Sequence, residues 1–152
     1  MSVSSATGQF DAGVHRFPVR AYFEDTDLTG VVYHANYLRY MERARSDMLV
    51  LVGIDQQSQM TSGEGYWAVA DVTIAYKRPA KFGDDLIVES RVTRVRAAAT
   101  VMQQTIKRGA EVLTDATVTA AWLDMRGRPQ RQPAEWSTRF EMLRRQAEVT
   151  EN

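Results

Sequence analysis

The spacing of apolar side chains changes along the chain and divides it into elements. Apolar and polar residues alternate over residues 18–23, which is the period of a half-buried strand. From Tyr37 onward the apolar residues recur at the spacing of one helix face, and Gly53 follows the run. We therefore predict a strand and then a helix of about four turns, with Asn36 as its N-cap and Gly53 as its stop.

A polar segment, residues 56–65, follows this helix, and we expect it to be a loop. Strand-like runs rich in Val, Thr, Ile and aromatic residues come next. They cover residues 67–76, 85–95, 100–107 and 112–123. Because their connections are too short for crossover helices, neighbouring strands should be antiparallel. The expected fold class is α+β, with a long central helix wrapped by a five-stranded antiparallel sheet.

The two ends of the chain are expected to lie outside this sheet. Residues 1–14 are rich in Ser, Ala and Gly and should form a flexible tail, and residues 148–152 a shorter one. Residues 15–147 form a single predicted domain of ordinary length. Its last part, residues 135–147, is a predicted C-terminal helix. Three apolar residues share one face of this helix: Trp136, Phe140 and Leu143.

Composition limits the partners of the chain. Its 19 basic and 19 acidic side chains cancel, which removes the whole-chain case for binding nucleic acid or an anionic membrane. No stretch approaches the roughly 18 apolar residues of a membrane span, so we expect no membrane insertion and a cytoplasmic protein. One helix cannot cover both faces of a five-stranded sheet, and a second copy of the chain is the simplest cover for the rest.

Several common catalytic arrangements are missing from the sequence. The absence of cysteine excludes disulfides, iron–sulfur clusters and cysteine nucleophiles. There is no Gly-x-Ser-x-Gly elbow, Walker loop or His-Glu-x-x-His motif. The only histidines are His15 and His34, and the glycine pattern of residues 63–68 precedes a strand where a dinucleotide site needs a helix. We therefore expect no metal and no cofactor.

An acidic cluster precedes the predicted long helix. Glu24, Asp25 and Asp27 are close enough in sequence to raise one another's pKa, which is common at catalytic sites. A plainer interpretation also fits, because Asp27 and Gly30 suit the first and fourth positions of a type I turn and the other two acids can be solvated. The cluster alone leaves both interpretations open.

The segment after the cluster favours chemistry at a carbonyl group. Residues 30–36 lead into the helix start, where unpaired N–H groups and the positive end of the helix dipole are available. A carboxylate beside such donors can attack, or activate water against, a carbonyl whose oxyanion they stabilise. A thioester is a suitable substrate because its leaving group needs little protonation. His34 can be an acid or base, a substrate contact or a structural residue.

Two stretches carry a resemblance to a known family. Residues 22–37 read Tyr-Phe-Glu-Asp-Thr-Asp-Leu-Thr-Gly-Val-Val-Tyr-His-Ala-Asn-Tyr, and residues 41–45 read Met-Glu-Arg-Ala-Arg. The chain resembles the acyl-CoA thioesterases of the hot-dog fold, in the 4-hydroxybenzoyl-CoA thioesterase group, and is most similar to the bacterial Tol-Pal-associated thioesterases. The resemblance, over residues 17–125, implies an acyl-CoA substrate and a homodimer or homotetramer with active sites between subunits. It also suggests association with a cell-envelope or lipid-synthesis complex.

The resemblance assigns roles to individual residues. Asp27 matches the catalytic carboxylate, as nucleophile or general base, and the backbone N–H of His34 matches the donor to the thioester oxygen. Tyr33 and Gly30 are the expected substrate-binding residues beside them. Some relatives bind the CoA phosphates through an Arg-Arg-Lys run, of which this chain keeps only Arg96.

Alternatives to this assignment stay open. A hot-dog hydratase would use an Asp-x-x-x-x-His pair, and Asp27 and His34 are too far apart for it. Another thioesterase branch carries its carboxylate on the central helix, which would nominate Glu42 or Asp47. We expect those acids on a solvated helix face, with Asp47 four residues from Arg43, which argues against that role. A non-catalytic acyl-ligand-binding or envelope-complex adaptor with the same fold is the remaining alternative.

Overall fold

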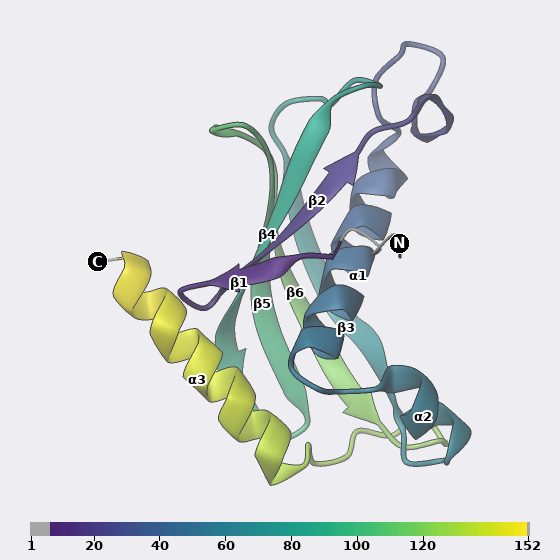
Figure 1. The fold of residues 1–152 in the computed structure, drawn as a ribbon. Coiled ribbons are helices and arrows are strands. Elements are labelled where there is room, and N and C mark those ends of the chain that lie inside the picture. The colour runs from purple at the N-terminus through teal and green to yellow at the C-terminus, as the bar shows by residue number, and fades with distance from the viewer. Residues whose placement is uncertain (1–6, 152) are drawn as a thin grey trace, which may run out of the picture.

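The computed structural model describes residues 7–151 and contains one antiparallel sheet with a long helix along one face (Figure 1). The elements are β1 (Gln9–Asp11), β2 (Val14–Arg20), the 3-10 helix η1 (Phe23–Asp25), α1 (His34–Leu51), α2 (Gln56–Thr61), β3 (Tyr66–Tyr76), β4 (Asp85–Val95), β5 (Ala99–Arg108), β6 (Glu111–Leu123) and α3 (Ala134–Glu151). The strand order is β1-β2-β4-β5-β6-β3, with every pair antiparallel. The predicted α+β class is confirmed, but the described sheet has six strands rather than five.

Helix α1 packs its apolar face onto the sheet and forms the main core. Tyr37, Met41 and Ala44 are buried in one cluster with sheet residues such as Val88 and Ile106. Full burial of a large apolar side chain stabilises the fold by about 1.5–3 kcal/mol, so this face accounts for the position of the helix. The predicted face and the predicted stop at Gly53 are both confirmed. Gly53 has a φ of +85°, which suits a glycine just after a helix end.

The start of α1 differs from the prediction. Its N-cap is Tyr33 and the helix begins at His34, so Asn36 lies inside the first turn. The Asn36 side-chain amide donates a hydrogen bond to the backbone carbonyl of Asp25 at 2.8 Å. The preference of Asn for N-caps therefore misplaced the boundary, because this side chain bonds a distant carbonyl instead.

The N-terminal part of the chain is more ordered than predicted. Strand β1 pairs with β2 through a tight turn at Ala12 and Gly13, which both have positive φ angles. The flexible tail expected over residues 1–14 is therefore wrong for Gln9–Asp11, and residues 1–6 lie outside the described residues. The strand expected over residues 18–23 also shifts, because β2 ends before the first turn of η1.

Two other boundaries were predicted wrongly. The expected loop over residues 56–65 contains α2, whose N-cap Asp55 accepts a hydrogen bond from the Ser58 backbone N–H at 3.1 Å. The C-terminal helix is confirmed, but α3 continues to Glu151 and so includes most of the tail expected over residues 148–152. In both places a helix extends into a polar segment that lacks an apolar period.

Helix α3 packs beside the C-terminal end of α1 and forms a second core. Trp136 and Phe140, which share the predicted apolar face, are buried with Trp122 and Leu49. The Arg139 guanidinium donates to the backbone carbonyl of Val52 and so links α3 to the end of α1. The chain therefore supplies a second helix to this side of the sheet.

Strand β3 forms one edge of the sheet. Within the described part of the chain it pairs only with β6, and Val69, Val72 and Tyr76 are exposed on it. An exposed edge strand that carries apolar side chains is suited to pairing with another strand.

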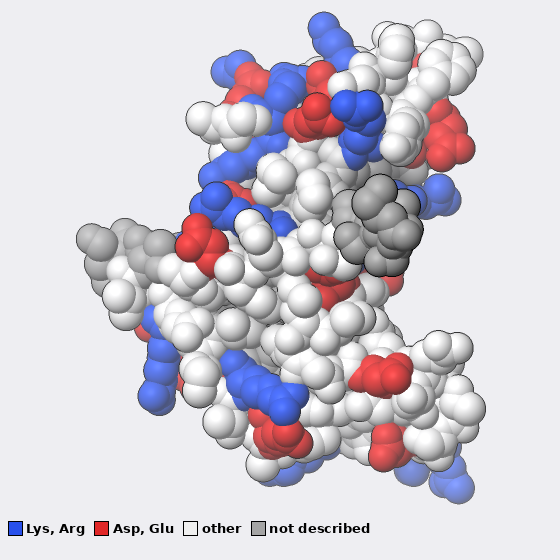
Figure 2. Space-filling view, in the orientation of Figure 1, with Lys and Arg blue, Asp and Glu red and all other residues white. Residues whose placement is uncertain are grey.

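Charged side chains of both signs share the surface. Figure 2 shows basic and acidic side chains beside one another on the face that it presents. Arg16 and Lys107 both pair with Glu89, at 3.3 and 2.6 Å. Among residues 7–151, no helix is both long enough and apolar enough to cross a lipid bilayer.

Candidate active site

The acidic segment before α1 folds back on itself as a small hairpin. Thr26 and Val32 form a β-bridge, and the Asp27 N–H donates to the Val31 carbonyl at 2.9 Å. The Gly30 N–H closes the turn on the Asp27 carbonyl at 3.1 Å, and Gly30 has a φ of +82°. The turn predicted over residues 27–30 is therefore present, and Asp27 is its first residue.

The Asp27 carboxylate is exposed and bonded within its own turn. Its Oδ1 accepts hydrogen bonds from the Thr29 hydroxyl at 2.6 Å and the Thr29 backbone N–H at 2.8 Å. These bonds, the hydroxyl first and the backbone second, lower the pKa of Asp27. The carboxylate is consequently ionised at neutral pH, which is the form that a nucleophile or general base requires.

Two hydrogen bonds attach this segment to the first turn of α1. The Asp25 carbonyl accepts from the Tyr33 N–H at 2.9 Å and from the Asn36 side chain at 2.8 Å. Tyr33, the N-cap, supplies no side-chain bond to the helix start. The N–H of His34, the first helical residue, therefore lies among the donors that a helix start leaves for other acceptors.

Aromatic residues position His34. Its exposed ring lies 4.4 Å from the Tyr33 ring, between centroids, and the Tyr76 hydroxyl donates to the His34 carbonyl at 3.0 Å. Beneath them, the Tyr37 hydroxyl accepts from the Ala80 N–H at 2.9 Å, and burial raises the pKa of Tyr37. The helix start is therefore tied to the end of β3 and to the segment after it.

A cavity of about 260 Å³ lies beside this helix start. It is lined by Val32, His34, Tyr37, Tyr76, Lys77, Arg78 and Pro79. Sequence reasoning assigned no role to Tyr76 or Lys77, although the passage from Tyr76 to Ala80 belonged to the stretch that resembles the thioesterases. Arg78 pairs with Glu111 at 2.7 Å, so part of its charge is neutralised.

Arg96 lies far from the other predicted site residues within one chain. It occupies the turn between β4 and β5, where its backbone bonds Ala99 and Gln132. At its opposite end, β4 starts with Asp85. The preceding residue, Asp84, is hydrogen-bonded to the segment that leads to η1. Because β4 has 11 residues, its ends are separated by about 35 Å. The structure therefore brings Asp27, Gly30, Tyr33 and His34 together in one segment and leaves Arg96 apart.

The middle of α1 has only part of the solvated, ion-paired face that was predicted, because Glu42 and Arg43 are exposed whereas Arg45 and Asp47 are partly buried. Asp47 has no bond to Arg43 and instead lies 2.7 Å from His15 Nε2, with the His15 side chain fully buried. Burial lowers the pKa of His15, although Asp47 acts in the opposite direction. Arg45 turns inward, and its Nη1 donates to Gln104 at 2.9 Å. The polar periodicity was misleading because these side chains have partners on β2 and β5.

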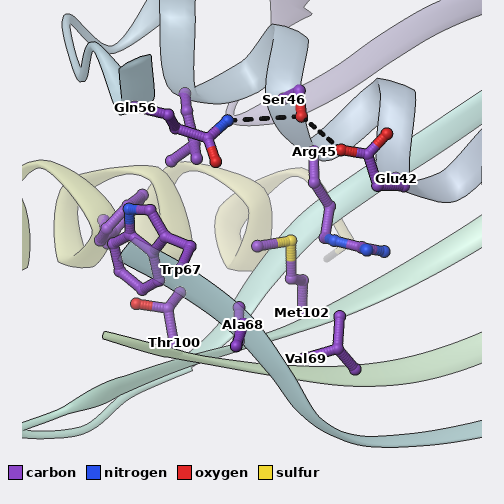
Figure 3. Close-up of a pocket in the computed structure, with 12 residues that line it drawn as sticks. Glu42, Arg45, Ser46, Gln56, Trp67, Ala68, Val69, Thr100 and Met102 are labelled. Atoms are coloured by element: carbon purple, nitrogen blue, oxygen red, sulfur yellow. Dashed lines mark hydrogen bonds between the residues drawn. The ribbon is translucent and has the colours of Figure 1, made fainter. Parts of the chain in front are cut away.

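Glu42 also departs from the predicted ion pairing. Its Oε1 accepts from the Ser46 hydroxyl at 2.8 Å. Both residues line a second cavity, beneath the C-terminal half of α1 (Figure 3). Glu42 therefore borders this cavity, unlike Asp47, which is bonded to the buried His15.

Comparisons with known proteins place the chain among thioesterases. The Thioesterase-like superfamily profile matches residues 22–146. The acyl-CoA thioesterase YbgC of Haemophilus influenzae is 38% identical over 129 residues, covering 84% of this chain and 95% of that protein. The acyl-CoA thioester hydrolase YbgC of Escherichia coli O6:H1 is 37% identical over 110 residues, covering 72% of this chain and 81% of that protein.

Solved structures share the fold. A probable thioesterase from Bartonella henselae superposes with a TM-score of 0.76 at 35% identity, covering 79% of this chain and 99% of that one. A thioesterase from Thermus thermophilus, crystallised with coenzyme A and zinc, has a TM-score of 0.75 at 26% identity, covering 87% and 94% of the two chains. The arrangement of a long helix against an antiparallel sheet is therefore common to these proteins.

Proposed function

The chain belongs to the thioesterase-like superfamily and has its hot-dog fold, and we propose that it is an acyl-CoA thioesterase whose catalytic carboxylate is Asp27. The observation that carries the proposal is the hydrogen-bonded hairpin that attaches the Asp27 turn to the first turn of α1. An ionised carboxylate and unsatisfied backbone donors, the two elements that acyl transfer needs, thus belong to one structural unit.

In the proposed reaction the thioester oxygen accepts a hydrogen bond from the His34 N–H. The Asp27 carboxylate either attacks the carbonyl carbon, giving an acyl-aspartyl anhydride as the CoA thiolate leaves, or removes a proton from an attacking water molecule. In the first route water then hydrolyses the anhydride, and in the second the tetrahedral intermediate expels the CoA thiolate. In both routes the thiolate takes up a proton from the water that reacted, giving the free acid and the CoA thiol. The His34 N–H stabilises the negative charge on the oxygen in both routes.

Gly30 and Tyr33 are proposed to line the substrate path next to Asp27. A Cβ at Gly30 would meet no atom within 4 Å, so this position leaves room for a ligand as well as allowing the turn. Lys77 and Arg78, at the cavity beside His34, are proposed to attract the CoA phosphates. Arg96 could join this site only from a second copy, because it lies at the other end of the sheet.

A second copy is proposed to pair along the exposed edge of β3, giving a homodimer that can pair again into a homotetramer. Antiparallel pairing about the middle of β3 would place the Tyr66 end of one protomer beside the partner's Tyr76. Since Tyr76 bonds the His34 carbonyl, each catalytic hairpin would then lie next to the other protomer. The exposed Val69 and Val72 would be covered by this pairing.

Asp27→Asn tests the proposal, because it keeps the shape of the side chain and removes its charge. We expect kcat on acyl-CoA substrates from short to long chains to fall by at least about 100-fold, the contribution of one acid–base or nucleophilic group. Glu24→Gln, at an exposed acid of the same segment, is the matched control and should retain activity.

Undiminished hydrolysis by the Asp27→Asn variant would remove Asp27 from the mechanism. Loss of all activity in Glu42→Gln, with Asp27→Asn active, would assign the reaction to the central helix. If the wild-type protein hydrolyses no acyl-CoA of any chain length, the adaptor function is favoured.

A further inference from the structure

The cavity beneath the C-terminal half of α1 has chemically different ends. Its volume is about 260 Å³, near the lower limit of small-molecule sites at about 300 Å³. Trp67 and Phe140 contribute aromatic surface, and Met102 lies on the sheet side. Figure 3 shows Trp67 toward one end of the cavity and Arg45 and Glu42 together toward the other. The uncharged Gln56 and Thr100 lie near Trp67, so a bound chain would meet charged groups only at the far end, at Arg45 and Glu42.

Arg45 presents unused hydrogen-bond donors at the polar end. Its Nη1 donates to Oε1 of Gln104, and the Gln104 amide is itself fixed by the Met41 carbonyl at 3.0 Å and Ser90 Oγ at 2.9 Å. No carboxylate of residues 7–151 forms an ion pair with Arg45. A guanidinium has five N–H donors, and a partly buried one without a carboxylate gains from an additional acceptor. The remaining donors are therefore available to a ligand oxygen.

Glu42 supplies an acceptor at the same end. One carboxylate oxygen accepts from Ser46, whose hydroxyl oxygen also accepts from Gln56 Nε2 at 3.3 Å. A ligand hydroxyl can accept from Arg45 and donate to Glu42, so it satisfies both groups. A terminal methyl would satisfy neither, and a carboxylate could pair with Arg45 but would face the negative charge of Glu42 and could not donate to it. The pair therefore favours a neutral hydroxyl.

The cavity becomes reachable from a catalytic hairpin once two copies pair. Within one chain, His34 and Ser46 are about 18 Å apart along α1, so the cavity lies beyond the hairpin of the same protomer. Pairing of two β3 edges brings the partner's Tyr76, and with it the partner's His34, to the Tyr66 end of β3. Trp67 follows Tyr66 and lines the cavity. An acyl chain held at the partner's hairpin would enter there and extend toward Arg45.

We propose that this cavity binds the distal end of the acyl chain and selects aliphatic acyl groups that end in a hydroxyl. The inference rests on the proposed thioesterase function and adds a substrate class to it. Arg45 is the principal specificity-determining residue, and Glu42 is its counterpart.

The test compares kcat/KM for 6-hydroxyhexanoyl-CoA, heptanoyl-CoA and adipoyl-CoA in the full-length enzyme. The first two acyl groups differ only in a terminal hydroxyl against a methyl of similar size. We expect wild type to prefer the hydroxyl by about tenfold, the effect of one hydrogen bond to a charged group. Arg45→Met should abolish this preference, and Glu42→Gln should raise activity on adipoyl-CoA by removing the repulsion.

Arg43→Met is the matched control, because Arg43 is exposed on the other side of α1 and should leave the substrate ratio unchanged. Thermal unfolding of each variant identifies any loss of fold, and the Glu42 variant tests the same cavity if Arg45→Met is unstable. Equal activity of wild type on the hydroxyl and methyl substrates, or an unchanged preference in a folded Arg45→Met, would overturn the inference while leaving the thioesterase assignment intact. Absence of hydrolysis on all three substrates and on shorter and longer acyl-CoAs would instead overturn the proposed function.

Discussion

The two ends of α1 use different means to form a site. At the N-terminal end, Asp27 and His34 are exposed, and backbone hydrogen bonds between near neighbours shape the hairpin that carries Asp27 and attach it to the helix start at His34. At the C-terminal end, Trp67 and Phe140 come from β3 and α3 and enclose a cavity through packing. Substitutions of the exposed residues at the N-terminal end should have little effect on the core, whereas substitutions of the packed residues at the C-terminal end should disturb it. Under the two proposals above, chemistry and substrate selection would be separated along one helix.

Phe140→Ala should produce the largest change and affects only the C-terminal end. Phe140 is 1% exposed, so its truncation leaves a cavity and should lower the free energy of unfolding by about 3–5 kcal/mol. Urea unfolding followed by circular dichroism measures this loss. Met142→Ala, on the exposed side of the same helix, should change it by less than about 0.5 kcal/mol. Similar losses in both variants would contradict the packing role.

The stability of the fold should depend on pH through His15, which contacts Asp47 of α1. Its pKa is lowered by burial, so the unfolded chain binds a proton at higher pH than the folded chain. The free energy of unfolding should fall as pH falls below about 6.5, by up to about 1.4 kcal/mol per pH unit, until the folded pKa is reached. Urea titrations at pH 7.5 and 5.5 test this, and a His15→Gln variant should show a flatter dependence. The same dependence in both proteins would exclude His15 as the cause.

Tyr76→Phe should affect the N-terminal end alone. It removes the hydrogen bond to the His34 carbonyl and keeps the ring, so kcat/KM on acyl-CoA should fall roughly 3- to 10-fold. The unfolding free energy should change by no more than about 1.5 kcal/mol. Tyr22→Phe, an exposed tyrosine before η1, is the control. If it lowers activity as much as Tyr76→Phe, the bond to His34 has no particular role.

Thr29→Val should give the smallest effect and addresses only the ionisation of Asp27. Loss of the Thr29 hydroxyl removes the largest cause of the lowered Asp27 pKa, so that pKa should rise. Activity that requires ionised Asp27 should then be lost at a higher pH as the solution is acidified. A pH profile of kcat/KM reports the shift. The control is Thr138→Val, because Thr138 is an exposed threonine of α3. An unmoved acidic limb would show that another group sets it.

The turn and the helix at the N-terminal end could be predicted because their signals are local. The turn residues Asp27 and Gly30 and the helical period that starts at Tyr37 lie within a few residues of one another. Local hydrogen bonds then determine most of the geometry. The exact helix start was missed because Asn36 bonds the Asp25 carbonyl, which an N-cap preference does not reveal.

The C-terminal cavity could not be predicted, because its walls come from segments far apart in the sequence. A charged residue on a helix is usually exposed, so Arg45 gave no sign that it turns inward to Gln104, 59 residues later. Asp47 likewise bonds His15, 32 residues earlier. Such contacts depend on the exact orientation of α1 on the sheet. Apolar periodicity predicts which face of the helix packs on the sheet, but not that orientation.

The aromatic cluster at the C-terminal end of α1 has an optical consequence. All 3 tryptophans of the chain, Trp67, Trp122 and Trp136, lie there, with ring centroids 4.8–5.8 Å apart. Intrinsic tryptophan fluorescence consequently reports on this end of the molecule, since Trp67 lines the cavity and the Asp27 hairpin contains no indole. A change in emission on adding substrate would signal occupation of the cavity, and turnover at Asp27 would need a separate label.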